Sequence, residues 1–439
     1  MVGQRLDQPA QPTKAAKGRI KSLDGLRGVA ALIVVFHHIL LTVPSLALAY
    51  EFTEPRYAHD WLDILTYTPL HLIWDGPAAV VIFFVLSGYV LSVPYAAGKT
   101  GGWRSYYPQR LLRLYLPVWG ALIFSLIAVT AVQRHYVPGA TYFVNLHATA
   151  PHGVAQAARN ATLLLKTGWL DSPLWSLRFE VAFSVFLPLA VWGGAVCPRL
   201  WAVKGAACLA VVVAGWQLHS QLLEYVPMFG FGVILAYEQE RFRAVTRRFT
   251  QPQWIAITTV SVLLISSYWD LWGLGLGGIA AFGQALSAIG GCGVLVAVRD
   301  WPSARRFGEA APIQWLGKRS FSLYLIHEPI VLTVVFALGG KPNVALIFAI
   351  ALPITMVLTE VFYRLVEHPS HLFALAVGRL VKERWPVQPG HGGHRGRLRP
   401  GLQEGVATTV EPAPRLPPYR ADPGGHRTTT IAPPGPPRR

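Results

Sequence analysis

The chain contains the segment SLDGLRGVAALIVVFHH, residues 22–38, which is largely apolar but carries ionisable side chains. Between Arg27 and His38 every residue is apolar except Gly28 and His37. In an α-helix these two positions are about three turns apart, so their side chains lie on nearly the same face, roughly 16 Å apart along the axis. Ionisable groups are costly inside a segment this apolar. When such a segment spans a membrane, they are candidates for function.

The composition extends this interpretation to the whole chain. Of 439 residues, 52% are hydrophobic and only 14% are charged, and the 15 Trp and 16 Tyr fit the interfacial aromatic belts of an integral membrane protein. A net charge of +17 raises the alternative of a nucleic-acid partner. We reject it because the positive charge lies in short connections between apolar segments and in a polar tail, as membrane topology would place it. We therefore expect a lipid bilayer and no nucleic acid among the partners.

Ten apolar segments follow one another along the chain. We expect each to form a transmembrane helix, because strands exposed to lipid could not satisfy their backbone hydrogen bonds. The predicted fold class is an all-α integral membrane protein, one bundle of about ten transmembrane helices with a disordered cytoplasmic C-terminal tail. The segments lie at about 28–43, 77–93, 114–132, 174–196, 200–216, 222–237, 253–269, 278–298, 320–338 and 343–363.

Lysine and arginine are distributed unequally between the two sides of this bundle. The connections on one side, together with both termini, hold 33 of them, whereas the other side holds five and Arg178 is left inside a span. Positive residues collect on the cytoplasmic side, so both termini are expected in the cytoplasm of a multi-pass protein of the cell (inner or plasma) membrane.

The chain is expected to have three parts. Residues 1–21 form a cytoplasmic leader, 22–370 form the membrane domain, and 371–439 form a cytoplasmic tail. From about residue 386 the sequence is rich in Pro, Gly, Arg and Thr with almost no apolar clusters, which predicts disorder.

Several polar residues in and near the spans have both a structural and a functional interpretation. Arg27 follows Asp24 by three positions, so it is either a local ion pair or part of a site at the cytoplasmic mouth. His38 lies deeper, where a neutral imidazole can accept a proton. Arg110 and Arg113 are one turn apart, and either anchor the positive side or bind phosphate.

Two further spans carry polar residues. Ser176 and Glu180 share a helix face, and Glu180 needs a partner such as His38 or Arg178, because an unpaired carboxylate inside a span is improbable. Tyr324 and His327 face one way in the ninth span. They either form hydrogen bonds between helices or contact a substrate.

Small residues are expected to pack helices closely. Ser87 and Gly88 stand together near the cytoplasmic end of the second span. Residues of this size let two helix backbones approach.

Taken together, these segments resemble the acyltransferase-3 family of integral membrane O-acyltransferases. The matching text, in family order across roughly residues 22–369, is SLDGLRGVAALIVVFHH, FFVLSGYVLS, RLLRLYLPVW, LWSLRFEVAF, SFSLYLIHEPI and VEHP. The resemblance implies ten spans, cytoplasmic acyl-CoA as donor, and transfer of an acyl group, commonly acetyl, to a hydroxyl of a carbohydrate, glycolipid or metabolite. The resemblance also implies functional roles for eight residues, which are Arg27, His38, Arg110, Arg113, Trp175, Ser176, Glu180 and His327.

Three positions depart from the family pattern. Val181 stands where many members have a second acid, Gln109 where a basic residue often precedes Arg110, and Arg178 replaces a small residue. These departures bear on recognition of the acceptor more than on the chemistry.

The expected function is acyl-CoA-dependent O-acyl transfer. His38 acts as general base or as a transient acyl carrier, with Arg27 and Glu180 as the other catalytic residues; Glu180 orients a histidine or contacts the acceptor. The cytoplasmic arginines hold the donor's phosphates. No bound cofactor and no metal are expected, since no ligand cluster appears in the sequence. The alternative is a transporter or flippase of a glycan or lipid-linked substrate, which also needs ionisable residues along a path through the membrane.

Overall fold

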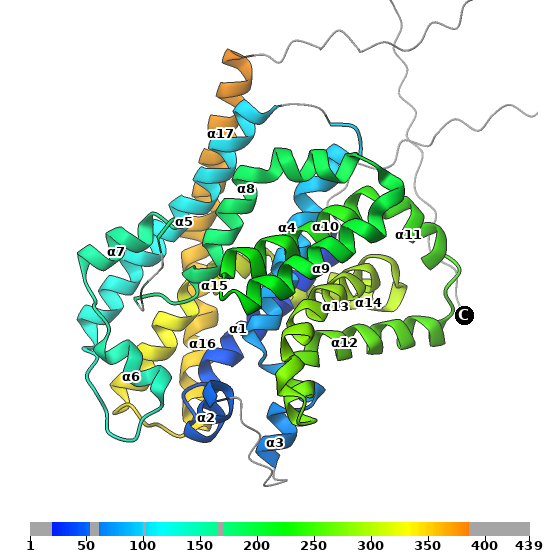
Figure 1. Ribbon diagram of the computed structural model, residues 1–439. Helices are drawn as coiled ribbons and strands as arrows, with labels where there is room; N and C mark the ends of the chain where they lie inside the picture. Colours follow the sequence, from blue (N-terminus) through cyan, green and yellow to red (C-terminus); the bar gives the residue numbers. More distant parts are fainter. Residues whose placement is uncertain (1–19, 53–60, 100–101, 166–167, 169, 386–439) are drawn as a thin grey trace, which may run out of the picture. The chain divides into compact units, whose positions relative to one another are not determined.

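A computed structural model describes residues 20–52, 61–99, 102–165, 168 and 170–385. The chain divides into a unit of Met1–Gln388 and a unit of Pro389–Arg439, and all described residues belong to the first. Every regular element among them is helical (Figure 1). The predicted leader up to residue 19 and the predicted disorder from about 386 lie outside the described residues.

The described helices follow one another with short connections. The α-helices are α1 (Lys21–Leu40), α2 (Pro44–Phe52), α3 (Trp61–Thr66), α4 (Gly76–Ala96), α5 (Trp103–Ala131), α6 (Tyr142–Thr149), α7 (Val154–Ala161), α8 (Leu174–Ala195), α9 (Trp201–Gln217), α10 (Gln221–Tyr237), α11 (Gln239–Thr246), α12 (Gln251–Gly273), α13 (Ala280–Asp300), α14 (Pro302–Glu309), α15 (Ala311–Ala337), α16 (Val344–Phe362) and α17 (His368–Arg384). The short helical turns are η1 (Pro69–Ile73), η2 (Pro198–Leu200), η3 (Gly277–Ile279) and η4 (Tyr363–Glu367).

The long helices coincide with the ten predicted segments. Within the described residues, nine helical stretches are long and apolar enough to cross a membrane, and α10 is an apolar helix of 17 residues. Their outward faces are apolar as well, since Ile123 of α5, Leu189 of α8 and Val357 of α16 are each more than 60% exposed. Large exposed apolar surface of this kind suits contact with lipid rather than water. The prediction of an all-α membrane protein is therefore confirmed.

Glycines bring the site-bearing helices into close contact. A Cβ at Gly28 of α1 would lie 2.5 Å from the backbone nitrogen of Gly317 in α15. A Cβ at Gly88 of α4 would collide with the carbonyl oxygen of Phe229 in α10. Both helix pairs thus approach backbone to backbone, as small residues permit in membranes. The close packing predicted at Gly88 is confirmed.

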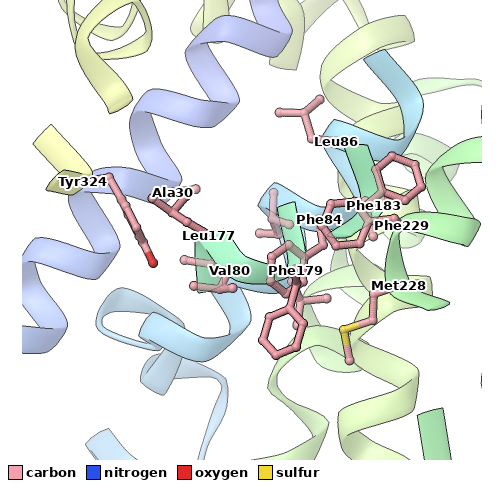
Figure 2. Packing of buried hydrophobic residues seen from close by; sticks show 14 of the residues in the cluster. Ala30, Val80, Phe84, Leu86, Leu177, Phe179, Phe183, Met228, Phe229 and Tyr324 are labelled. Carbon is pink, nitrogen blue, oxygen red and sulfur yellow. The ribbon is translucent and has the colours of Figure 1, made fainter. Parts of the chain in front are cut away.

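An aromatic cluster joins α4, α8 and α10 (Figure 2). The ring of Phe229 stacks on Phe84 with centroids 4.6 Å apart and on Phe183 at 4.4 Å, while Phe179 meets Phe84 edge-on at 6.1 Å. Rings in these arrangements have favourable offset and edge-to-face electrostatics in addition to their buried area. The cluster fixes the three helices that form one wall of the candidate site.

The tenth span continues past its predicted end. A π-helical turn, η4, joins α16 to α17, and α17 packs along α5 (Figure 1). Glu367 in that turn accepts a 2.9 Å hydrogen bond from the backbone nitrogen of Ser322 in α15. π-Turns are rare and frequently mark functional sites. The segment predicted as the tail from residue 371 therefore begins with helix up to Arg384.

Candidate functional site

The shared face of α1 borders two pockets. Arg27 lines a cavity of about 360 Å³, the Arg27 pocket, and His38 lines a cavity of about 200 Å³, the His38 pocket. Val80 of α4 and Tyr324 of α15 line both cavities. The two ionisable residues predicted to share a face thus lie in neighbouring pockets with a common wall.

The lining of the Arg27 pocket combines basic and apolar side chains. The apolar residues include Phe83 and Leu177 from α4 and α8. Basic residues collected from four helices are expected to attract a polyanionic ligand, while the apolar part suits an extended uncharged chain. The acidic, basic and histidine residues of the lining are Arg27, Arg110, Arg113, Glu180, Lys318, Glu367, His368 and His371.

The partner of Glu180 is Arg110. Their side chains form an ion pair between α8 and α5, each only 12–13% exposed. Ser87 of α4 donates a 3.0 Å hydrogen bond to the same carboxylate, and Arg110 Nε donates to Ser184 Oγ at 3.0 Å. The prediction that Glu180 has a partner is confirmed, but the partner is neither of the suggested residues, His38 and Arg178, because helix packing brings α5 to this point of α8.

Arg178 lies on a different face of α8 from Glu180. It donates to the side-chain oxygen of Gln221 and its guanidinium carbon lies 4.5 Å from the ring centroid of Phe179. A guanidinium over an aromatic face is a favourable cation–π contact. This residue borders a separate groove that contains neither Arg27 nor His38.

The common wall is held by a polar contact. The hydroxyl oxygen of Tyr324 lies 2.9 Å from the carbonyl of Pro173 and 2.7 Å from Ser176 Oγ. Ser176 Oγ also lies 3.3 Å from the carbonyl of Pro173, so either hydroxyl can be the donor in the contact between them. The alternative of hydrogen bonding between helices is thus realised for Tyr324, which nevertheless faces both pockets.

The tautomer of His38 follows from its neighbours. His327 Nδ1 lies 3.0 Å from the carbonyl of Leu323, so that nitrogen bears hydrogen and Nε2 is left as an acceptor. His38 Nδ1 lies 3.0 Å from this Nε2 and 2.9 Å from the carbonyl of Val34. Both neighbours accept, so His38 carries its hydrogen on Nδ1. Its Nε2 holds the free lone pair.

The His38 pocket is aromatic and uncharged. Trp175 and Tyr225 line it, with ring centroids 5.1 Å apart, and the other rings in the lining are those of Tyr50, Tyr324, His37 and His38. His37 Nδ1 bonds the carbonyl of Trp74 at 2.9 Å. Although His37 and His38 diverge around α1, both border this cavity. None of the described lining residues is Asp, Glu, Lys or Arg.

A buried carboxylate, Glu328, lies beside His38. Its Oε1 is 3.8 Å from His38 Nε2 and 3.1 Å from His147 Nε2, and Glu328 is completely buried. Ser172 holds the other side of the group, donating its backbone N–H to Oε2 at 2.5 Å and its hydroxyl to Oε1. Within the described residues, no group of three or more His, Cys, Asp or Glu is arranged to hold a metal ion.

Two charged residues accompany Glu328 outside the spans. Burial lowers the pKa of Arg134 to about 10, an effect that Glu328 and Asp171 oppose. Burial also raises the pKa of Asp171 well above its usual value, with the nearby charge of Glu328 acting in the same direction. The connection between α5 and α8 therefore carries buried ionisable groups next to the His38 end of the site.

Comparison with known proteins places the chain in a family. The sequence model of a family described as "Acyltransferase domain" matches residues 20–364. The chain belongs to the acyltransferase-3 family. Acyltransferase clz18 from Cochliobolus lunatus is 23% identical over 405 residues, covering 74% of this chain and 85% of that protein. Acyltransferase MdmB from Streptomyces mycarofaciens is 29% identical over 207 residues, covering 44% of this chain and 45% of that protein. No solved structure matches.

The family membership confirms the resemblance drawn from the motifs, and the protein is a multi-pass membrane acyltransferase. Within this acyltransferase-3 chain, the sequence analysis missed Glu328 and His147. A signal existed for Glu328, because a carboxylate inside a predicted span requires a partner. None existed for His147, which belongs to a short helix in a connection and reaches the site only through the fold.

Proposed function

We propose that this acyltransferase moves an acyl group, expected to be acetyl, from acyl-CoA to a hydroxyl of a carbohydrate, glycolipid or metabolite. The observation that carries the proposal is the common wall of the Arg27 pocket and the His38 pocket at Val80 and Tyr324. A polyanionic donor suits the first pocket and a hydroxyl facing a base suits the second. The reacting atoms of two substrates would meet at this wall.

The donor is proposed to occupy the Arg27 pocket. Arg27, Arg113 and Lys318 offer positive charge for the phosphates of CoA, and the apolar lining residues Phe83 and Leu177 suit the uncharged arm that carries the thioester. Arg110 lines the same pocket, and its contacts with Glu180 and Ser184 use only part of the guanidinium, so it can also contribute to phosphate binding.

His38 is proposed to be the general base. As the acceptor oxygen attacks the thioester carbonyl carbon, His38 Nε2 takes the hydroxyl proton. The carbon–sulfur bond then breaks, and the CoA thiolate takes the proton from His38. The imidazole returns to its neutral form, so the reaction uses acyl-CoA as a substrate and no bound cofactor or metal. Transient acylation of the same nitrogen would give the same products.

The acceptor is proposed to enter the His38 pocket. Trp175, Tyr225 and Tyr50 offer flat apolar faces, and Gln221 and the histidines offer polar contacts. An uncharged lining disfavours a carboxylate or phosphate close to the reacting hydroxyl, since burying an unpaired charge is costly. The part of the acceptor that enters is therefore a neutral hydroxylated group.

The orientation in the membrane follows from charge. The connections and ends on the Arg27 side of the bundle hold most of the lysines and arginines. The positive-inside rule then places the Arg27 pocket toward the cytoplasm, where acyl-CoA is made, with both termini on that side. We propose the cell membrane as the location.

The decisive experiment combines a purified protein with a comparison of strains. Protein in detergent or liposomes is given acetyl-CoA and extracts of surface glycans, glycolipids and secreted metabolites, and release of the CoA thiol is followed. Mass spectrometry of the same fractions from a strain lacking the gene should reveal a missing acyl mass. Movement of a substrate across liposomes without thiol release would instead support a transporter and overturn the proposal.

A further inference from the structure

We propose that Glu328 is the positioning residue for His38 and supplies the negative charge that His38 needs when it takes a proton. The inference rests on the proposed function. Glu328 Oε1 lies 3.8 Å from His38 Nε2, the nitrogen whose lone pair is free, and the carboxylate is completely buried. A charge at this distance and depth interacts strongly with an imidazolium, because little water screens it.

The contacts of Glu328 suit the ionised form. Ser172 directs a backbone N–H and a hydroxyl at the two oxygens, and neither needs a proton from the carboxyl group. His147 Nδ1 lies 2.8 Å from the carbonyl of Phe143, while its Nε2 faces Glu328 at 3.1 Å. Each ring nitrogen of His147 thus lies near an oxygen, so the imidazole sits between the Phe143 carbonyl and the Glu328 carboxylate.

Proton transfer places a positive charge on His38. When His38 takes the acceptor's proton, its imidazolium faces the buried Glu328 carboxylate, which His147 also contacts. Without the carboxylate, the new charge on His38 would lose the counter-charge beside it. The other groups around His38 do not substitute for it, because His327 and His37 are bases and the Tyr324 hydroxyl contacts Pro173. Glu328 is therefore the group whose loss should slow the chemical step.

The same contacts link the base to the connection between α5 and α8. His147 belongs to α6, and Ser172 lies two residues before the start of α8. Both hold Glu328, which projects from α15 one position after His327. The geometry of that connection thereby sets the position of the carboxylate relative to His38.

Two substitutions of Glu328 separate charge from packing. Glu328→Gln keeps the size of the side chain and removes the charge, whereas Glu328→Asp keeps the charge and shortens the chain. If charge matters, kcat should fall at least about 10²-fold in Glu328→Gln, with Glu328→Asp retaining more activity. KM for acetyl-CoA should stay unchanged in both. A purely structural role predicts the reverse order, because Gln fits the cavity better than Asp.

The assay uses full-length purified protein with acetyl-CoA and the acceptor fraction in which the comparison of strains reveals a missing acyl mass. Glu238→Gln is the matched control, since Glu238 is also a buried carboxylate, paired with Arg241 far along the chain from the site. It should leave kcat unchanged. Glu328→Gln with wild-type kcat, or with kcat above that of Glu328→Asp, overturns the role of Glu328.

A second variant keeps the proposal testable if Glu328→Gln does not fold. Ser172→Ala removes one hydrogen bond to the carboxylate and leaves its charge, so kcat should fall about 10-fold at constant KM for acetyl-CoA. Wild-type kcat in Ser172→Ala would then overturn the inference. Failure of the wild-type protein to transfer an acyl group at all would overturn the proposed function instead, so the two failures are distinguishable.

Discussion

His327 Nε2 lies 3.0 Å from His38 Nδ1, which joins the imidazoles of α15 and α1 inside the bundle. The contact leaves only one arrangement of hydrogens consistent with the neighbouring carbonyls, and it turns His38 Nε2 toward Glu328. His327 therefore fixes the tautomer and the orientation of His38. The close approach of α1 to α15 at Gly28 and Gly317 makes this contact possible.

The first prediction concerns the proposed base. His38→Ala should lower acyl transfer by at least the ~10²–10⁴-fold typical of losing a general acid–base group. His37→Ala should cost much less, because His37 bonds the carbonyl of Trp74 and has no contact with Glu328. The measurement is kcat with acetyl-CoA for both purified variants. A nearly normal kcat for His38→Ala together with an inactive His37→Ala would mean that His37, and not His38, is the base.

The sequence predicted what depends on one helix at a time. The long apolar segments correspond to helices. The spacing of Arg27 and His38 predicted one shared helix face, and the two side chains line neighbouring pockets. Contacts between side chains of different helices could not be predicted from the pattern of a single helix. Arg110 and Glu180 are 70 residues apart, and only the packing of α5 on α8 brings them together. The same holds for His147, which reaches Glu328 from a connection.

The second prediction concerns the donor pocket. Arg113→Gln should raise KM for acetyl-CoA by roughly 10-fold, the loss expected for one charge-assisted contact to phosphate, with little change in kcat. Raising the salt concentration should weaken donor binding in the wild-type protein, because charges near the mouth of a pocket are screened. Arg379→Gln, outside the pocket lining, is the control. Equal KM in Arg113→Gln and the control would remove Arg113 from the donor site.

The third prediction concerns the Arg110–Glu180 pair. Arg110→Gln leaves the Glu180 carboxylate nearly buried beside Ser87 without its counter-charge, which should destabilise the fold by about 3 kcal/mol. Arg110→Gln/Glu180→Gln should recover part of this loss, because two neutral amides can still form hydrogen bonds. Thermal unfolding in detergent measures both. Additive losses in the double variant would show that the two side chains do not depend on each other.

The fourth prediction concerns pH and the start of α4. Asp75 caps this helix, accepting a 2.9 Å hydrogen bond from the Ala78 backbone nitrogen, and burial raises its pKa from 3.8 to about 7. The neighbouring charge of Asp270 acts in the same direction, and the cap bond opposes it. Between about pH 4 and pH 7 the unfolded chain has released this proton while the folded protein still holds it. Stability should therefore fall as pH rises through this window and level off above it.

The substitution Asp75→Asn tests this prediction. An asparagine caps a helix as well as an aspartate and does not titrate. The variant should unfold at a higher temperature than the wild type at pH 8, and this difference should shrink toward zero at pH 4. The measurement is the unfolding temperature of both proteins in the same detergent across that range. Parallel curves for the two proteins would mean that Asp75 does not hold a proton in the folded state.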